Sequence, residues 1–172
     1  MQLTSKKPDE LVFEDLIRDY KEKLYWHIRR MVISHDDTDD VLQNTFIKVY
    51  KNLGNFKGES QVYTWLYRIA TNETITFLNK RAKTLKLSNE SLQQSLVSNL
   101  TSDPYFDGDA AQLKLQEAIN QLPPKQKQVF IMKYYDDLQY NEIAKILDTS
   151  EGALKASYHH AVKKITQHVL NN

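Results

Sequence analysis

Apolar residues in this chain recur at intervals of three and four positions, and no stretch alternates regularly between apolar and polar residues. In the first thirty residues these positions are Leu11, Leu16, Ile17, Tyr20, Leu24 and Ile28. Residues at this spacing lie on one face of a helix. The pattern therefore predicts an all-α protein without a sheet.

The N-terminal half contains two more segments with helical spacing. One runs from Thr38 or Asp39 to Leu53, and aspartates near its start suit the positive end of a helix dipole. The other begins near Thr64 and ends at about Lys83, after a polar break at 55–61. The side chains expected to point inward are Leu42, Phe46, Val49 and Leu53 in the first segment and Leu66, Ile69, Ala70, Phe77 and Leu78 in the second.

Residues 84–109 are rich in Ser, Asn, Gln and Asp, with scattered leucines. Segments of this composition bury little apolar surface and often stay flexible. We therefore expect two small helical domains, 8–83 and 110–170, joined by a flexible linker that is partly disordered. The alternative is that the leucines of the linker lie along a groove of a partner.

The C-terminal half ends in the pattern of a helix-turn-helix. A short helix at 113–122 is followed by Pro124, which suits the first position of a helix. After a polar break at 148–149, Ser150 is placed to cap the last helix. That helix has Leu154, Tyr158, Ala161 and Ile165 on one side and Lys155, His159, His160 and Lys163 on the other. A helix with one packed face and one cationic face fits the DNA major groove.

Charge alone does not indicate a nucleic-acid partner, because 23 Lys and Arg residues nearly balance 22 Asp and Glu residues and leave a net charge of +1. The charges are segregated, with an acidic segment at 36–40 and a basic cluster at 80–86. Such a distribution suits two partners of opposite character. The lack of cysteine excludes disulfides, thiol catalysis and thiolate metal sites.

No targeting or catalytic motif stands out. The amino terminus has no apolar signal core, and no segment approaches the roughly 20 apolar residues that cross a bilayer, so we expect a cytoplasmic protein without membrane insertion. There is no Gly-rich phosphate loop, nucleophile elbow or HExxH motif, so we expect neither an enzyme nor a cofactor.

Adjacent helical residues point about 100° apart, which favours a solvent- or DNA-facing role for His159 and His160 over a shared metal. The acid pairs at 39–40 and 136–137 are interpreted as helix-end and surface acids.

A polar stripe on the third predicted helix consists of Arg68, Asn72, Asn79 and Lys83, with Tyr63, Trp65 and Tyr67 just upstream. Cations bind phosphates and aromatic rings stack on exposed bases, so this combination suits unpaired nucleic acid. The alternative is an ordinary amphipathic helix with Trp65 and Tyr67 in the core.

Ile47 lies among polar residues on the solvent face of the second predicted helix, beside Gln43, Asn44 and Lys48. A lone exposed isoleucine often has no role. An apolar residue within a polar ring also suits the centre of a protein–protein contact. Both interpretations stay open.

Three blocks in this order resemble the sigma-70 family of RNA polymerase sigma factors, in its small, two-domain extracytoplasmic-function (ECF) group. They are DDVLQNTF at 39–46, TWLYRIATN at 64–72 and LPPKQKQVF at 122–130. The likeness extends over 39–60, 62–83 and 115–165, which is most of the chain except the linker. It implies a promoter-specificity subunit that lends polymerase sequence recognition and helps to melt DNA.

The resemblance also implies three binding surfaces. The clamp helices of the polymerase β′ subunit would be bound by Asp39, Asp40, Gln43, Phe46, Ile47 and Lys48. The −10 promoter element would be opened and held by Asn55, Lys57, Ser60, Gln61, Tyr63, Trp65, Arg68, Asn72, Lys80 and Arg81. The −35 element would be read in its major groove by Ser150, Glu151, Gly152, Lys155, Ala156, Ser157, His159, His160 and Lys163.

The implied partners are promoter DNA and core RNA polymerase, through its β′ clamp helices and its β subunit. Family members are often held inactive by an anti-sigma protein, so such a partner is implied as well. The chain departs from the family at Gln139, where Ser or Thr usually caps a helix, and at Asp148, where Gly is common. Ala156, Ser157 and His160 stand where the family often has Ser-Arg and a later Arg, so we expect a different −35 sequence.

Two other function classes remain at this stage. A stand-alone helix-turn-helix transcriptional regulator would bind paired half-sites as a dimer. A helical adaptor would use the helix-turn-helix only as a packing motif. The regulator does not explain the aromatic and basic stripe at 63–83 or an exposed Ile47.

Overall fold

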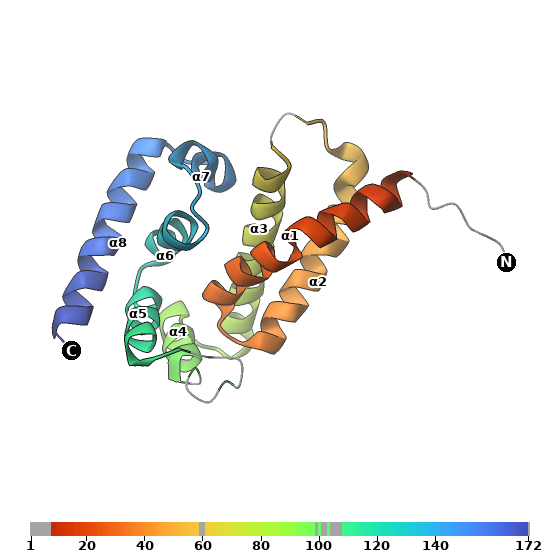
Figure 1. Cartoon of the computed structure of the whole chain (residues 1–172). Coiled ribbons are helices and arrows are strands. Elements are labelled where there is room, and N and C mark those ends of the chain that lie inside the picture. Colours follow the sequence, from red (N-terminus) through yellow and green to blue (C-terminus); the bar gives the residue numbers. More distant parts are fainter. Residues whose placement is uncertain (1–7, 59–60, 99, 101–102, 104–107, 172) are drawn as a thin grey trace.

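The computed structural model describes residues 8–58, 61–98, 100, 103 and 108–171, and these residues form helices and no strand. In chain order the helices are α1 (Pro8–Val32), α2 (His35–Asn52), η1 (Leu53–Asn55), α3 (Val62–Thr84), α4 (Asn89–Ser98), α5 (Ala110–Asn120), α6 (Pro124–Phe130), η3 (Ile131–Tyr135), α7 (Tyr140–Leu147) and α8 (Glu151–Asn171). Figure 1 shows α1–α3 as one group on the right and α5–α8 as a second group on the left, with α4 at the lower end. The predicted all-α class is confirmed.

The N-terminal group is built from three helices that all contact one another. α2 begins at His35, earlier than the predicted Thr38 or Asp39, because the Ser34 hydroxyl accepts a hydrogen bond from the Asp37 N–H and caps the helix. α3 likewise begins two residues before the predicted Thr64. Helical bonding starts at the Gln61 carbonyl, which accepts from the Trp65 N–H at 3.2 Å.

Part of the predicted linker is helical and packed. Leu92 and Leu96 of α4 are buried, as is Leu100, against Ile33 and Ala82 from the ends of α1 and α3. These three leucines are therefore covered by this chain, and the interpretation that they lie along a partner's groove is wrong for them. Apolar side chains at three- and four-residue steps favour this local helix once a surface is present to cover it.

In the C-terminal group, α6 starts at Pro124 as predicted. After Phe130 the chain continues as a π-helical turn, η3, and the Asp136 N–H donates to the Ile131 carbonyl at 3.2 Å. Short π segments are rare and frequent at functional positions. Here the π turn precedes Asp136, the residue that connects the two groups of helices.

The sequence predicts that Asp136 is a helix-end or surface acid, and the structure differs from this prediction. Its side chain is only 3% exposed, and its Oδ2 lies 2.6 Å from the Nδ1 of His27 in α1. It is therefore a buried acid, not a surface acid, because the C-terminal group packs onto α1 and α3 at this point. Its neighbour Asp137 is exposed, as expected.

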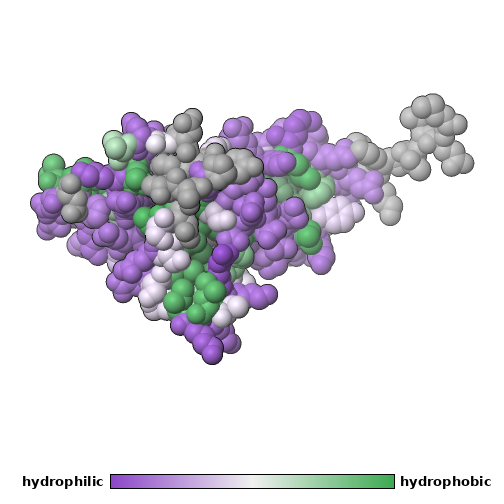
Figure 2. Space-filling model, turned by 90° about the horizontal axis from the view of Figure 1, so that it is seen from below, coloured by the Kyte–Doolittle hydropathy of each residue, from purple (hydrophilic) through white to green (hydrophobic). Residues whose placement is uncertain are grey.

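One apolar core joins the two groups. It contains Leu24 and Tyr67 from the N-terminal group together with Met132 and Ile143 from the C-terminal group. α7 packs directly on α3. On the face seen in Figure 2, hydrophilic side chains cover most of the described surface and apolar clusters are small and separate. None of the described helices has the length and apolar character needed to span a bilayer.

Candidate polymerase and nucleic-acid interfaces

An apolar groove runs between α1 and α2. It is lined by Phe13, Ile17 and Lys21 from α1 and by Leu42, Gln43, Phe46, Ile47, Tyr50 and Lys51 from α2. Ile47 is 51% exposed and Tyr50 is 49% exposed. The Phe13 ring packs edge-on against Tyr50 at 5.0 Å and against Phe46 at 6.2 Å, so the floor of the groove is aromatic.

Charged residues border this groove and the helix that carries it. Lys21 and Lys51 are exposed at the groove itself. Lys48 forms an ion pair with Glu73 of α3. Asp39 lies near His35, with its carboxylate 3.5 Å from the ring Nε2. A half-exposed apolar centre within a polar rim is the anatomy of a protein-binding surface.

The loop before α3 contains a second aromatic feature. The Phe56 ring lies 4.8 Å from the Trp65 ring, with 37° between the planes. Gly58 adopts φ +69°, a conformation that favours glycine. Asn55 and Lys57 are exposed beside it. The predicted contact Ser60 lies outside the described residues.

The polar stripe of α3 faces solvent. Arg68, Asn72, Asn79 and Lys83 are all exposed. Tyr67, by contrast, is buried, and burial together with nearby Asp136 raises the pKa of its hydroxyl, so Tyr67 acts as a neutral core residue. Trp65 is half-buried. The core interpretation therefore holds for Tyr67, whereas Trp65 stays partly accessible.

Among the other predicted −10 residues, Gln61 and Lys80 are exposed and Tyr63 is half-buried. Arg81 forms an ion pair with Asp37 at the start of α2, which holds its guanidinium on the protein. The basic cluster at 80–86 is thus partly neutralised, and Lys80, Lys83 and Lys86 remain its exposed cations.

The helix-turn-helix has the predicted turn. Asp148 ends α7 in the left-handed conformation, with φ 50° and ψ 55°. The Ser150 hydroxyl accepts a hydrogen bond from the Ala153 N–H at 3.2 Å and so caps α8. Gln139 is not a usual cap residue. The Glu142 carboxylate accepts a hydrogen bond from the Gln139 N–H at 2.8 Å, which satisfies a backbone donor at the start of α7.

α8 presents a polar face and buries an apolar one. Leu154, Ala161 and Ile165 are buried, and Tyr158 is half-buried, as predicted. The predicted −35 residues that are exposed are Ser150, Glu151, Gly152, Lys155, Ala156, His159, His160 and Lys163, while Ser157 is half-buried. The Lys155 ammonium lies 5.7 Å from the centre of the Tyr140 ring, so α7 helps to orient a cation on the exposed face.

Comparison with known families gives the same two parts. Residues 16–84 match the model of Sigma-70 region 2, and residues 112–165 match the model of Sigma-70, region 4. Together the matches cover well over half of the chain. The chain belongs to the sigma-70 family.

Relatives of this sigma factor include members of the ECF group. It is 34% identical over 162 residues to the ECF RNA polymerase sigma factor SigW of Bacillus subtilis, covering 90% of this chain and 87% of SigW. It is 30% identical over 179 residues to the ECF RNA polymerase sigma-E factor of Escherichia coli K12, covering 95% of this chain and 90% of that protein.

Two solved structures share the fold. The sigma factor RpoE, in complex with the anti-sigma factor NepR from Bartonella quintana, superposes with a TM-score of 0.72 at 19% identity, over 91% of this chain and 96% of RpoE. CnrH, in complex with the cytosolic domain of CnrY, gives a TM-score of 0.70 at 20% identity, over 95% of this chain and 90% of CnrH. These likenesses support the arrangement of helices described above.

The structure also contains features of this sigma factor that the sequence interpretation missed. Phe13 and Tyr50 extend the surface around Ile47, and Phe56 pairs with Trp65. Tyr50 lies three residues after Ile47, on the same helical face, so the spacing alone contains a signal for it. Phe13 comes from another helix, and no local pattern connects it with α2.

Proposed function

We propose that this sigma factor binds core RNA polymerase through the α1–α2 groove, opens the −10 element with the loop before α3 and with α3 itself, and reads the −35 element with α8. It does no covalent chemistry of its own and acts in the cytoplasm. The observation that carries the proposal is the exposed apolar groove around Ile47, which apart from Phe13 lies in the part that matches Sigma-70 region 2. A transcriptional regulator that acts without polymerase would not require this groove.

The groove suits the clamp helices of the β′ subunit. An apolar residue from a partner helix can enter between Phe13 and Ile47, while the rim residues Gln43, Lys21 and Lys51 stay solvated or bind its polar side chains. Because Ile47 and Tyr50 are already held by a folded helix, little conformational entropy is lost on binding. Asp39 and Asp40 extend the surface along α2.

The −10 surface suits single-stranded DNA. Arg68 and Asn72 lie one helical turn apart on the exposed side of α3, where a guanidinium can meet a phosphate and an amide can meet a base edge. The Phe56–Trp65 pair stands at the start of the same helix. A flipped base stacked on these rings gains roughly 1–3 kcal/mol, which offsets an unstacking cost of a few kcal/mol.

The −35 surface suits the major groove of a duplex. Residues near the start of a recognition helix contact base edges, and on α8 these are Glu151, Gly152, Lys155 and Ala156. Ala156 suits a thymine methyl group, and Lys155 suits a guanine or a phosphate. The shortage of arginine leaves few bidentate guanine contacts, so we propose that its −35 sequence differs from that of arginine-rich relatives.

Weak binding by each surface alone is sufficient. When polymerase holds one part of the sigma factor, the other part acts at a high effective concentration. This accounts for a DNA-binding protein with a net charge of only +1. RpoE was solved with an anti-sigma factor, and an anti-sigma protein is accordingly proposed as a further partner of this chain.

The test uses purified full-length protein and core polymerase. Co-elution of the two, followed by transcription that starts at discrete sites only when the sigma factor is present, is the expected result. Mapping the starts and aligning the upstream DNA identifies both elements. Tight binding of a palindromic operator without polymerase, combined with no co-elution, would replace this proposal with a stand-alone regulator.

A further inference from the structure

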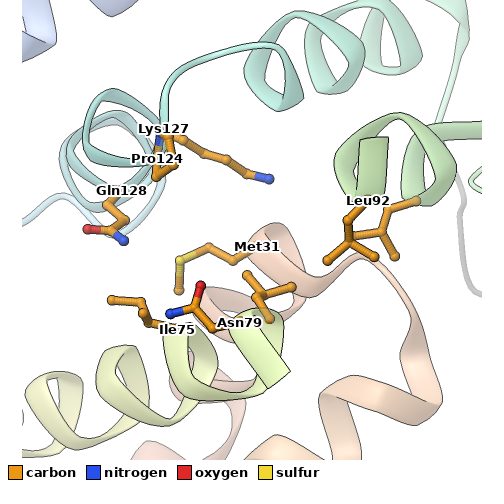
Figure 3. Close-up of a pocket in the computed structure, with 9 residues that line it drawn as sticks. Met31, Ile75, Asn79, Leu92, Pro124, Lys127 and Gln128 are labelled. Carbon is orange, nitrogen blue, oxygen red and sulfur yellow. The ribbon is translucent and has the colours of Figure 1, made fainter. Parts of the chain in front are cut away.

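A small cavity lies beside α6 of this sigma factor, and its volume is about 80 Å³. The apolar side chains of α1, α3 and α4 that line it are Met31, Ile75, Leu78, Leu92 and Leu96. Figure 3 shows Met31, Ile75 and Leu92 across the space from Pro124 and Lys127 of α6. The cavity therefore has an apolar wall on one side and a lysine on the other.

Lys127 is the one charged residue among the described residues that line this cavity. Its side chain is buried, and its ammonium group points into the space (Figure 3). The ammonium donates a hydrogen bond to the Asn120 amide oxygen at 2.6 Å. An ammonium has three N–H donors, so this bond leaves donors for a further acceptor.

The amide of Asn120 contributes a second buried donor at the same place. Its oxygen accepts from Lys127 and also from the Gln116 amide at 3.4 Å. Its nitrogen is buried without a hydrogen-bond partner among the residues that the structure describes. Buried donors without an acceptor are rare and costly. Two such groups side by side suit an anion.

No acidic side chain in the described part of the chain forms an ion pair with Lys127. Glu90 and Glu117 line a neighbouring groove together with Asn120, and neither bonds to the ammonium. Burial lowers the pKa of Lys127 to about 8, so most molecules still carry the charge at neutral pH. A buried charge is stable when it is paired, and here a counter-ion has to come from outside the chain.

The volume and the apolar wall restrict which counter-ion fits. A dry cavity of about 150 Å³ holds one benzene molecule, so a cavity of this size suits roughly three to five non-hydrogen atoms. A carboxylate has two acceptor oxygens and can therefore accept from Lys127 and Asn120 together. A short alkyl chain behind it would cover Leu92 and Leu96, whereas an inorganic anion would not.

We propose that this cavity binds a short aliphatic carboxylate of the size of acetate or propionate, with its oxygens on Lys127 and Asn120 and its alkyl group against the side chains of α3 and α4. The site is separate from the polymerase and DNA surfaces proposed above, and the inference does not depend on them. So small a ligand binds weakly, with a dissociation constant of about 0.1–10 mM.

Methionine methyl groups give a local measure of binding in the full chain. The three methionines are Met1, Met31 and Met132. Met31 lines the cavity, whereas Met132 is buried in the core that contains Leu24 and Ile143. With carbon-13 in the methyl groups, sodium acetate is expected to shift the Met31 signal along a saturating curve and to leave the Met132 signal in place.

Lys127→Gln and Lys125→Gln make a matched pair, because each removes one positive charge from α6, one buried and one exposed. Lys127→Gln should raise the dissociation constant for acetate by about tenfold or more, since the carboxylate loses a charged hydrogen bond. Lys125→Gln should bind acetate as the parent does. Acetamide, which has nearly the same shape without the charge, should leave Met31 unshifted.

Three results would overturn the inference. They are a Met31 signal that acetate does not shift at about 0.1 M, well above the expected dissociation constant, an equal shift produced by chloride at the same ionic strength, and equal affinities of the two variants for acetate. Chloride is therefore titrated in parallel, and the ionic strength is held constant throughout.

A series of ligands on the parent protein covers the case in which Lys127→Gln does not fold, as judged by far-ultraviolet circular dichroism. Acetate and propionate should both bind, and pivalate, which carries the same charge on a branched and larger body, should bind about tenfold more weakly because a packed cavity wall does not accommodate it. Equal binding of all three acids would show that the cavity does not select the ligand and would overturn the assignment.

Discussion

Ile47 shows how one exposed side chain distinguishes between functions. It lies on a helix whose opposite face, including Thr45 and Val49, is fully packed, so its exposure is not a consequence of poor folding. Phe13 and Tyr50 place further apolar surface beside it. Clusters of this kind, preorganised by folded neighbours, dominate the energetics of protein interfaces.

Replacing Ile47 with Asp is therefore expected to weaken polymerase binding by about 2 kcal/mol or more, because a charge would be buried in an apolar contact. Thermal stability should change little, since the position is half-exposed. Affinity is measured by pull-down or biolayer interferometry with core polymerase. Asn44→Asp, on the same helix but outside the groove, is the control. Equal affinities for the two variants would contradict the proposed interface.

Arg68 and Asn72 act, in our proposal, after the first promoter contact. The double change Arg68→Ala and Asn72→Ala should leave the initial closed complex nearly unchanged and reduce strand opening, because these groups meet DNA only when bases are unpaired. Permanganate reactivity of −10 thymines measures opening, and filter binding measures the initial complex. A double change of Lys163 and Lys164 to Ala should instead weaken the initial closed complex and leave strand opening nearly unchanged. Parent-like permanganate reactivity in the α3 variant would rule the role out.

At the scale of elements, short local signals decide where helices begin and end. Ser34 starts α2 and Ser150 starts α8 by the same capping bond. The Ser150 signal is easy to interpret because a polar break precedes it. Ser34 is followed by six polar residues, so the apolar pattern predicts a start of α2 at Thr38 or Asp39 although the cap lies upstream.

Removing the α8 cap should destabilise the helix-turn-helix. Ser150→Ala leaves first-turn N–H groups without their side-chain partner, which costs about 1 kcal/mol in the free energy of unfolding. Urea unfolding followed by circular dichroism measures the loss. Thr149→Ala, one residue outside the capping bond, should have a smaller effect. If both substitutions cost the same, the cap contributes nothing of its own.

At the scale of the whole molecule, residues of α1, α3 and α4 line the same small cavity as Lys127 of α6. Burial lowers the pKa of Lys127 to about 8, from an ordinary value of 10.5. Between these two pH values the unfolded chain holds a proton that the folded protein has released. The contribution of Lys127 to the free energy of unfolding therefore increases as the pH rises from about 8 to 10.5.

Lys127→Met should remove this increase and should stabilise the protein below pH 8, where the parent buries a charge. Urea unfolding at several pH values measures both effects. Tyrosines with raised pKa values contribute equally to parent and variant, so the difference between them isolates Lys127. The exposed neighbour change Lys125→Met should keep the parent's pH dependence. A parent curve parallel to that of Lys127→Met would show that Lys127 is not destabilised by burial.

The helices, the cap of α8, the left-handed Asp148 and the exposed Ile47 all follow from residues within a few positions of one another. Helical periodicity and capping are local, so a single chain is enough to predict them. The packing of α4 and the burial of Asp136 do not follow in this way. Periodicity says which face of a helix points inward, and it does not say which part of the protein covers that face.

His27 and Asp136 are 109 residues apart, and nothing near either one indicates the other. Their pairing depends on a π turn that redirects one chain segment and on the docking of two helical groups that the sequence predicts only as separate units. The family was thus predictable from local pattern and motif, whereas the binding surfaces that it implies stay predictions. The packing of the two groups depends on contacts between residues far apart in the chain, both in the shared apolar core and between His27 and Asp136, and no local interaction encodes them.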